Sequence, residues 1–115
     1  MKSLKTNRSI PAAEKALLVR CRQAVESIDP SAEVILYGSR ARGEARLDSD
    51  YDLLILTDGP ANLSTEDAFR RRLYPIELET GAALTVILTS RKDWQSPLYA
   101  AMPLYQNIRR EGIRL

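Results

Sequence analysis

Histidine is absent from this 115-residue sequence, and cysteine occurs once, at Cys21. A bound metal would therefore take its side-chain ligands mainly from carboxylates, a set that suits Mg²⁺ or Mn²⁺. Cys21 lies within an apolar pattern of helical spacing, so we expect a buried thiol in a cytoplasmic protein, where cysteines stay reduced. A reactive cysteine is the alternative.

Long apolar runs and blocks of like charge are missing too. No run approaches the roughly 20 apolar residues that a membrane-spanning helix needs, and the basic, polar segment Met1–Ile10 is followed by no apolar region. The 17 basic and 15 acidic residues are spread along the chain and give a net charge of +2. We therefore expect a single domain over residues 1–115 that has neither a membrane nor a nucleic acid as its partner.

Two apolar runs on either side of a polar loop dominate the middle of the sequence. The first, Glu33–Tyr37, contains no proline and ends at Gly38, which predicts a buried strand. The second, Tyr51–Thr57, is apolar on both alternating faces, as is typical of a central strand. Between them, Gly38 allows a close backbone approach, and Ser39 with the amides after it could begin a short helix that binds an anion.

Two aspartates, Asp50 and Asp52, stand at the start of the second strand. Residues i and i+2 of a strand point the same way and lie about 6.6 Å apart along it. Two such charges repel by roughly 2–3 kcal/mol at an effective dielectric near 20, unless a cation lies between them. We therefore predict that Asp50 and Asp52 bind Mg²⁺ or Mn²⁺; a pair of strand-end caps is the alternative.

The flanking segments have helical periodicity. A first helix is expected to begin near Pro11 and to end at Asp29–Pro30. A second is expected from an N-cap at Ser64 and contains Pro75, so it either kinks there or ends near Tyr74; we favour a kinked helix that ends before Gly81. The first helix has an apolar stripe formed by Leu17, Cys21, Ala24, Val25 and Ile28, and the second has one formed by Phe69, Leu73 and Ile76.

The remaining elements complete the expected fold. Arg70–Arg72 is interpreted as a solvated helix face rather than a binding patch. Residues 83–89 alternate as a third strand, and a final helix over Pro103–Glu111 is expected to stop at Gly112 with a hydrophobic contact from Ile113. This order of elements predicts an α/β (α+β) fold, a small mixed β-sheet flanked by helices.

The central motif resembles a known signature. A hydrophobic run, Gly38-Ser39, ten residues, and then Asp50-hydrophobic-Asp52 is similar to the pattern of the DNA polymerase beta nucleotidyltransferase superfamily, above all to its minimal nucleotidyltransferase (MNT) domains. The segment 41–45 contributes to the match, and the ending over 103–115 matches more loosely. The resemblance implies the nucleotidyltransferase fold, in which the Gly-Ser turn and the aspartates meet at one end of adjacent strands.

The resemblance also implies a reaction, the transfer of a nucleoside monophosphate, in the first instance AMP from ATP, to a hydroxyl. Asp50 and Asp52 would be catalytic and would hold the metal. The nucleotide-binding residues would be Gly38, Ser39, Arg40 and Arg42, with the arginines offsetting charge on the pyrophosphate. For each arginine, a surface ion pair with a nearby acid such as Glu44 is the alternative.

One departure from the family pattern concerns a third carboxylate. Active members usually carry it on a later strand, and the position that aligns here is Thr85. A threonine hydroxyl is a poor Mg²⁺ ligand and a poor base at neutral pH. Glu77 and Glu79 are candidate substitutes, and a solvated helix end is the alternative for both.

Two classes of function follow. The first is an enzyme that adenylylates a partner, because MNT domains often act as the antitoxin beside a small helical toxin of the HEPN type. The second is a catalytically degenerate module that binds a nucleotide and regulates a partner by contact. Apolar residues near the C-terminus would supply the contact surface, or else pack in the core: Trp94, Leu98, Tyr99, Met102 and Tyr105.

Overall fold

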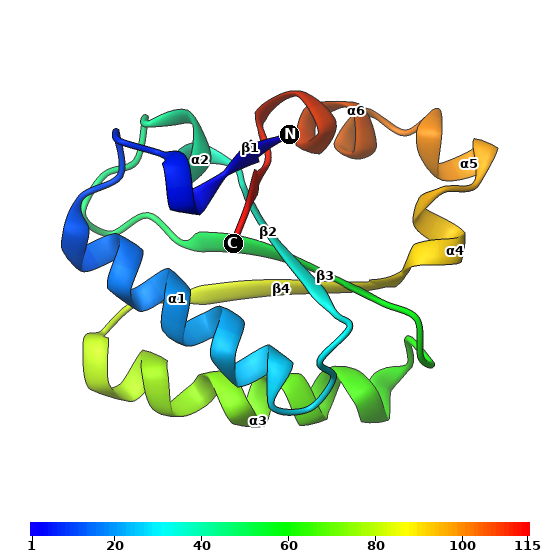
Figure 1. Ribbon diagram of the computed structural model, residues 1–115, viewed down its shortest axis with the longest axis horizontal. Coiled ribbons are helices and arrows are strands. Elements are labelled where there is room, and N and C mark those ends of the chain that lie inside the picture. The colour runs from blue at the N-terminus through cyan, green and yellow to red at the C-terminus, as the bar shows by residue number, and fades with distance from the viewer.

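Five strands in the order β1-β5-β2-β3-β4 form one mixed sheet in the computed structural model, which describes residues 1–115 (Figure 1). β2 runs antiparallel to β3 and β5, whereas β3 and β4 are parallel, as are β1 and β5. The strands are β1 (Lys2–Ser3), β2 (Glu33–Tyr37), β3 (Tyr51–Thr57), β4 (Leu84–Ser90) and β5 (Ile113–Arg114). The predicted bounds of the two central strands are confirmed, and the third strand begins and ends one residue later than predicted.

The helices lie on both sides of this sheet. α1 and α3 run along one face, and α6 lies across the other (Figure 1). The helical elements are the 3₁₀ helix η1 (Leu4–Thr6), α1 (Ala12–Glu26), α2 (Ser39–Arg42), α3 (Leu63–Thr80), α4 (Arg91–Trp94), α5 (Pro97–Ala100) and α6 (Pro103–Glu111). The predicted bounds of α6 are confirmed. None of these helices has both the length and the apolar character needed to cross a membrane.

The main core lies between the sheet and the pair α1 and α3. Leu18 and Cys21 of α1 and Phe69 of α3 are fully buried there. Burial raises the pKa of the Cys21 thiol to about 12, so the thiolate needed for reactivity is disfavoured. The prediction of a buried thiol is confirmed.

A smaller core lies beneath α6 on the other face. Ile108, the central contact of α6, is fully buried against Ile35 and Leu54. Leu104 lies one turn earlier but is 36% exposed, so it does not join this core. Because β3 has apolar residues on both faces, it contributes to both cores, as expected of a central strand.

The C-terminal aromatic residues pack against one another, and Trp94 also packs against the smaller core. The Trp94 ring lies 4.7 Å from the Tyr105 ring and 6.4 Å from the Tyr99 ring, measured between centroids. All three side chains are half-buried, whereas Leu98 is 73% exposed and Met102 39% exposed. Packing therefore accounts for the aromatic residues, and the two aliphatic side chains face outward.

The N-cap of α3 differs from the prediction. Asn62, not Ser64, caps the helix, because its side-chain oxygen accepts a hydrogen bond from the backbone N–H of Thr65 at 2.9 Å. The helix continues through Pro75 as far as Thr80 and ends before Gly81, as predicted. The exposed side chains of Arg70–Arg72 agree with a solvated helix face.

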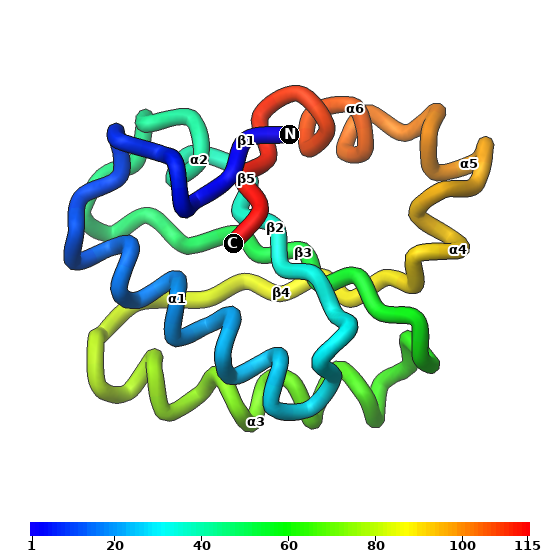
Figure 2. The backbone as a smooth tube through the Cα atoms, viewed as in Figure 1, coloured from blue at the N-terminus to red at the C-terminus, as the bar shows by residue number.

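The two ends of the chain lie beside each other. β1 pairs with β5, and β5 pairs with β2, so the first and last residues extend the sheet at one edge (Figure 2). The sequence did not predict these strands, because two residues are too few to show a periodicity.

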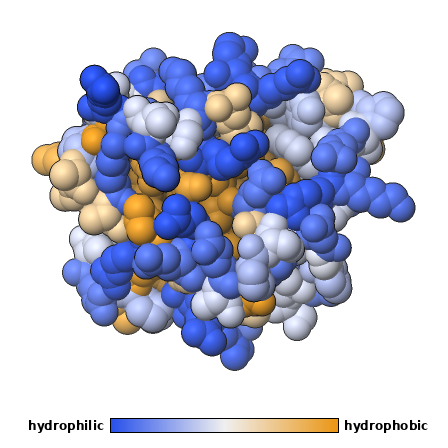
Figure 3. All heavy atoms as spheres, in the orientation of Figure 1, coloured by the Kyte–Doolittle hydropathy of each residue, from blue (hydrophilic) through white to orange (hydrophobic).

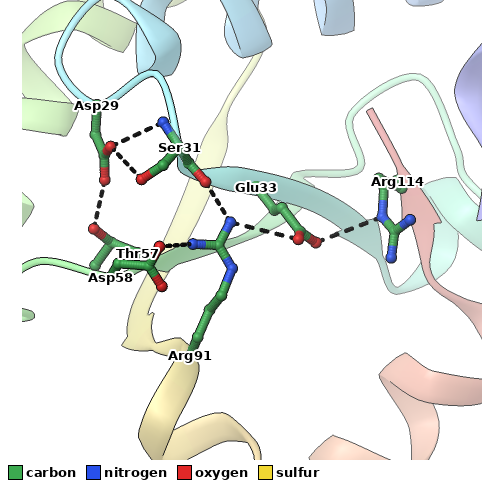
Figure 4. A network of polar contacts seen from close by, with 7 residues as sticks. All are labelled: Asp29, Ser31, Glu33, Thr57, Asp58, Arg91 and Arg114. Carbon is green, nitrogen blue, oxygen red and sulfur yellow. Dashed lines mark hydrogen bonds and ion pairs between the residues drawn. The ribbon is translucent and has the colours of Figure 1, made fainter.

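A network of polar contacts ties the strands together where β2 begins and where β3 and β4 end (Figure 4). The Arg91 guanidinium pairs with Asp58 at 2.9 Å and Glu33 at 3.4 Å, and it also donates to the Ser31 carbonyl. Beside it, Thr57 donates to Asp29 at 2.6 Å, and this bond and those from Ser31 lower the pKa of Asp29. This end of the sheet is held by ion pairs, whereas the candidate site lies at the opposite end.

Candidate functional site

The C-terminal end of β2 and the N-terminal ends of β3 and β4 meet at one end of the sheet. In the register of the strands Tyr37 lies opposite Asp52, and Asp52 lies opposite Thr85. Gly38 directly follows β2 and Asp50 directly precedes β3. The strand directions therefore bring the Gly-Ser turn, both aspartates and Thr85 to one place.

Gly38 is required here both by its backbone conformation and by its neighbour. Its φ of 75° lies in the left-handed region, which residues with a side chain rarely adopt. A β-carbon at this position would overlap the Asp52 carboxylate and would lie 3.1 Å from its Cγ. Ser39 then begins α2, whose first amides have no acceptor within the helix. The absence of a side chain at Gly38 therefore leaves the space that the Asp52 carboxylate occupies.

Asp52 is a half-buried carboxylate in a negatively charged setting. Burial, the charge of Asp50 and the charge of Glu111 raise its pKa, and the Arg42 guanidinium partly opposes them. The neighbouring Tyr37 hydroxyl also has a raised pKa, because of its burial and the charge of Asp52. A cation between the two aspartates would relieve this repulsion.

Thr85, which the family resemblance aligns with a third carboxylate, lies beside both aspartates. Its hydroxyl donates to Asp50 Oδ2 at 3.3 Å, and no three His, Cys, Asp or Glu residues are grouped as a metal cage. Two carboxylates nevertheless fit Mg²⁺, which proteins commonly bind through one or two carboxylates plus substrate phosphates. The site therefore suits a metal that is bound together with a phosphate ligand.

Neither candidate substitute for the third carboxylate reaches the aspartates. Glu77 accepts a hydrogen bond from the Leu84 backbone N–H at 3.2 Å, and Glu79 pairs with Arg20 of α1. Both belong to α3, which covers the sheet face opposite to α6. Glu77 and Glu79 are therefore residues of the helix end, which was the alternative to a role in the site.

The two candidate arginines differ in their surroundings. Arg40 pairs with Glu14, donates to the carbonyls of Leu47 and Ser49, and stacks 4.3 Å above the Tyr51 ring. Its side chain is only 12% exposed. Arg40 thus holds the loop that leads to Asp50, and its predicted contact with phosphate remains a prediction.

Arg42 is more accessible, with 41% of its side chain exposed. It pairs with Glu44 at 3.0 Å and with Glu111 at 3.2 Å, and these partners raise its pKa. The ion pair with Glu44 was the sequence-based alternative to phosphate binding. Arg42 also lines a cleft of about 380 Å³ beside α2, which neither aspartate lines.

Glu111 is the one residue of this site that the sequence did not predict. It is the last residue of α6, and its Oε1 accepts a hydrogen bond from the Gly38 backbone N–H at 3.2 Å. Glu111 lies in the loosely matching C-terminal segment, which was the only available signal. The structure alone shows that it joins the Gly-Ser turn.

Comparisons with known proteins bear on the family and the fold of this chain. A sequence model of the family described as Nucleotidyltransferase domain matches residues 18–108. A solved structure described as a candidate minimal nucleotidyltransferase is 31% identical, with a TM-score of 0.50, over 98% of this chain and 96% of its own. A structure of the Cid1 poly(U) polymerase is 26% identical, with a TM-score of 0.42, over 64% of this chain and 22% of that polymerase, so the chain spans under a quarter of its length. No curated protein sequence matches significantly. The predicted fold is confirmed, and the chain belongs to the nucleotidyltransferase domain family.

Proposed function

We propose that the site formed by the Gly38–Ser39 turn and the two aspartates binds a nucleoside triphosphate with Mg²⁺ and transfers its nucleoside monophosphate to a hydroxyl. The observation that carries the proposal is the fit of the Gly38 turn around Asp52, with Asp50 beside it. Family membership supports a nucleoside triphosphate as substrate. ATP is the proposed nucleotide, with AMP transferred.

Each residue has a distinct proposed role. Asp50 and Asp52 hold Mg²⁺ or Mn²⁺, which when bound neutralises phosphate charge and polarises the reacting phosphate. Gly38 leaves space for the Asp52 carboxylate, and Ser39 donates to an outer phosphate. Arg42 offsets the charge of the leaving pyrophosphate, for which its exposure leaves it accessible.

Arg40 has a supporting role in this proposal. Its contacts with the Leu47 and Ser49 carbonyls and with the Tyr51 ring fix the loop immediately before Asp50. Correct placement of Asp50 matters because small displacements of a catalytic group lower the rate strongly. The acceptor is proposed to be a hydroxyl on a partner protein of the HEPN-toxin type, which follows from the resemblance to MNT domains.

A second candidate function is a nucleotide-binding module without transfer activity. The observation that favours it is the hydrogen bond of Thr85 to Asp50 at the place of the third carboxylate. A threonine there offers no base to activate an acceptor hydroxyl. The two candidates share nucleotide binding and differ in transfer.

The test follows label from α-labelled ATP with Mg²⁺ onto protein, first with the chain alone and then together with the product of its neighbouring gene. Label in the wild type that is lost in Asp52→Asn supports the transferase. Thr85→Asp restores a third carboxylate; label that appears only in this variant supports the binding module. Label of equal intensity in Asp52→Asn contradicts both.

A further inference from the structure

Glu111, near the C-terminus, brings a third carboxylate to the candidate site. Its Oε1 accepts from the Gly38 N–H, and both carboxylate oxygens lie 3.2 Å from Arg42 Nη1. Its side chain is only 12% exposed. Glu111 therefore joins two groups of the proposed phosphate site, the turn and the exposed arginine.

The segment that carries Glu111 is held firmly in place. One turn earlier Ile108 is fully buried, and two residues later Ile113 of β5 is paired with Leu36 of β2. A β-carbon on Gly112 would lie 2.5 Å from the Ile108 carbonyl and 2.9 Å from Ile35 Cγ2, so only glycine allows α6 to end this close to β2. The Glu111 carboxylate is therefore carried by a segment of backbone that packing on both sides holds in place.

The position of Glu111 is electrostatically unfavourable for Asp52, because two like charges share a half-buried region. The same carboxylate is satisfied by a guanidinium and a backbone amide, both of which it orients. It belongs to no group of carboxylates arranged to hold a metal. The contacts of Glu111 therefore indicate that it orients the Gly38 N–H and the Arg42 guanidinium and does not bind the metal ion.

We propose that Glu111 is a positioning residue, which holds the Gly38–Ser39 turn and Arg42 in the arrangement that receives the phosphates of the nucleotide. This inference rests on the proposed function. Glu111→Gln would keep an oxygen acceptor for the Gly38 N–H but lose the charge that pairs with Arg42, whereas Glu111→Ala would lose both contacts. The two variants therefore separate the two roles of the side chain.

The experiment is a double-mutant cycle on binding of a non-hydrolysable ATP analogue with Mg²⁺, measured by calorimetry. Glu111→Gln should weaken binding about tenfold in the wild-type background and not at all in Arg42→Ala. Glu111→Ala should weaken binding in both backgrounds, because the turn is released in each. Glu26→Gln, which breaks an exposed ion pair with Arg22 on α1, is the matched control and should leave binding unchanged.

Hydrogen exchange of the Gly38 and Ser39 amides gives a second readout that needs no nucleotide. Exchange should quicken in Glu111→Ala and stay near wild type in Glu111→Gln. Equal binding by wild type and both variants, or tighter binding by either, overturns the inference while the proposed function stands. If the wild type binds no nucleotide, the proposed function fails; unchanged exchange in Glu111→Ala then overturns the positioning role as well.

Discussion

At the scale of single residues, Gly38 and Gly81 share a positive φ but differ in ψ, which is −158° at Gly38 and 1° at Gly81, and in their surroundings. Their φ values are 75° and 74°. A β-carbon on Gly38 would overlap Asp52, whereas one on Gly81 would meet nothing within 4 Å. A side chain at Gly81 meets only the cost of a left-handed backbone, whereas one at Gly38 meets a backbone conformation that is almost restricted to glycine and must also displace the Asp52 carboxylate.

Gly38→Ala should destabilise the protein by about 2–4 kcal/mol and abolish any rise in Tm with Mg²⁺ and ATP, because Asp52 must move. Gly81→Ala should cost only about 1–2 kcal/mol and keep that rise. Urea unfolding and thermal shift measure both effects. Equal losses of stability in the two variants, with ligand response kept in both, would show that Gly38 has no special relation to Asp52.

The raised pKa of Asp52 has a consequence for stability. Between the ordinary carboxyl pKa of 3.8 and the raised value, the folded protein binds more protons than the unfolded chain, so stability falls as pH rises through this range. Asp52→Asn removes this loss. In EDTA, its stability relative to wild type should therefore grow with pH across that range and then level off.

Urea unfolding of both proteins from about pH 3 to pH 8 tests this expectation. A difference in unfolding free energy that does not change with pH would show that Asp52 titrates normally. A variant that loses stability relative to wild type as the pH rises would reverse the proposed sign.

At the scale of elements, the two ends of the central strands differ in what holds them. The Arg91 network ties β2, β3 and β4 at one end through opposite charges (Figure 4). At the other end, Asp50 and Asp52 bring like charges together. The Arg91 network stabilises the fold. The repulsion between Asp50 and Asp52 lowers the stability, as is common at functional sites.

Arg91→Met should lower the unfolding free energy by about 1–2 kcal/mol, because Asp58, Glu33 and the Ser31 carbonyl lose a partly buried donor. The loss should shrink at high salt. Binding of ATP with Mg²⁺ should not change, since the network lies at the far end of the strands.

The control is Arg71→Met, which removes a 79% exposed arginine paired with Asp67 within α3. Its effect should stay within about 0.5 kcal/mol. Losses of equal size in the two variants would mean that the network adds nothing beyond an ordinary surface pair.

The elements with strong local patterns were predicted from the sequence with their bounds, namely β2, β3 and α6. The choice of Asn62 over Ser64 as N-cap could not be predicted, because both are good caps and only the geometry of the entering chain selects one. β1 and β5 were missed because their order depends on pairing with distant residues. Local periodicity carries no information about such pairing.

The same limit explains the candidate site. The spacing from Gly38 to Asp52 lies within one stretch of sequence and matches a family signature, so these residues were predicted together. Glu111 is separated from Gly38 by 73 positions. Nothing local distinguishes it from other charged residues at a helix end, and only the fold brings it to the turn.

At the scale of the whole molecule, the 17 basic and 15 acidic residues are spread along the chain, and several large apolar side chains are exposed. The face in Figure 3 is mostly hydrophilic, with apolar side chains gathered near its centre. The exposed aliphatic residues Leu98, Met102 and Leu104 lie along α5 and α6 and the turn between them.

The central claim is that Asp50 and Asp52 bind a nucleotide together with a divalent metal. Calorimetric titration of ATP into the wild type and Asp52→Asn, each in Mg²⁺ and in EDTA, tests it most directly. The account predicts binding to the wild type only in Mg²⁺, with an affinity at least about tenfold higher than that of Asp52→Asn. Equal binding in EDTA, equal binding by Asp52→Asn, or no binding by the wild type would contradict it.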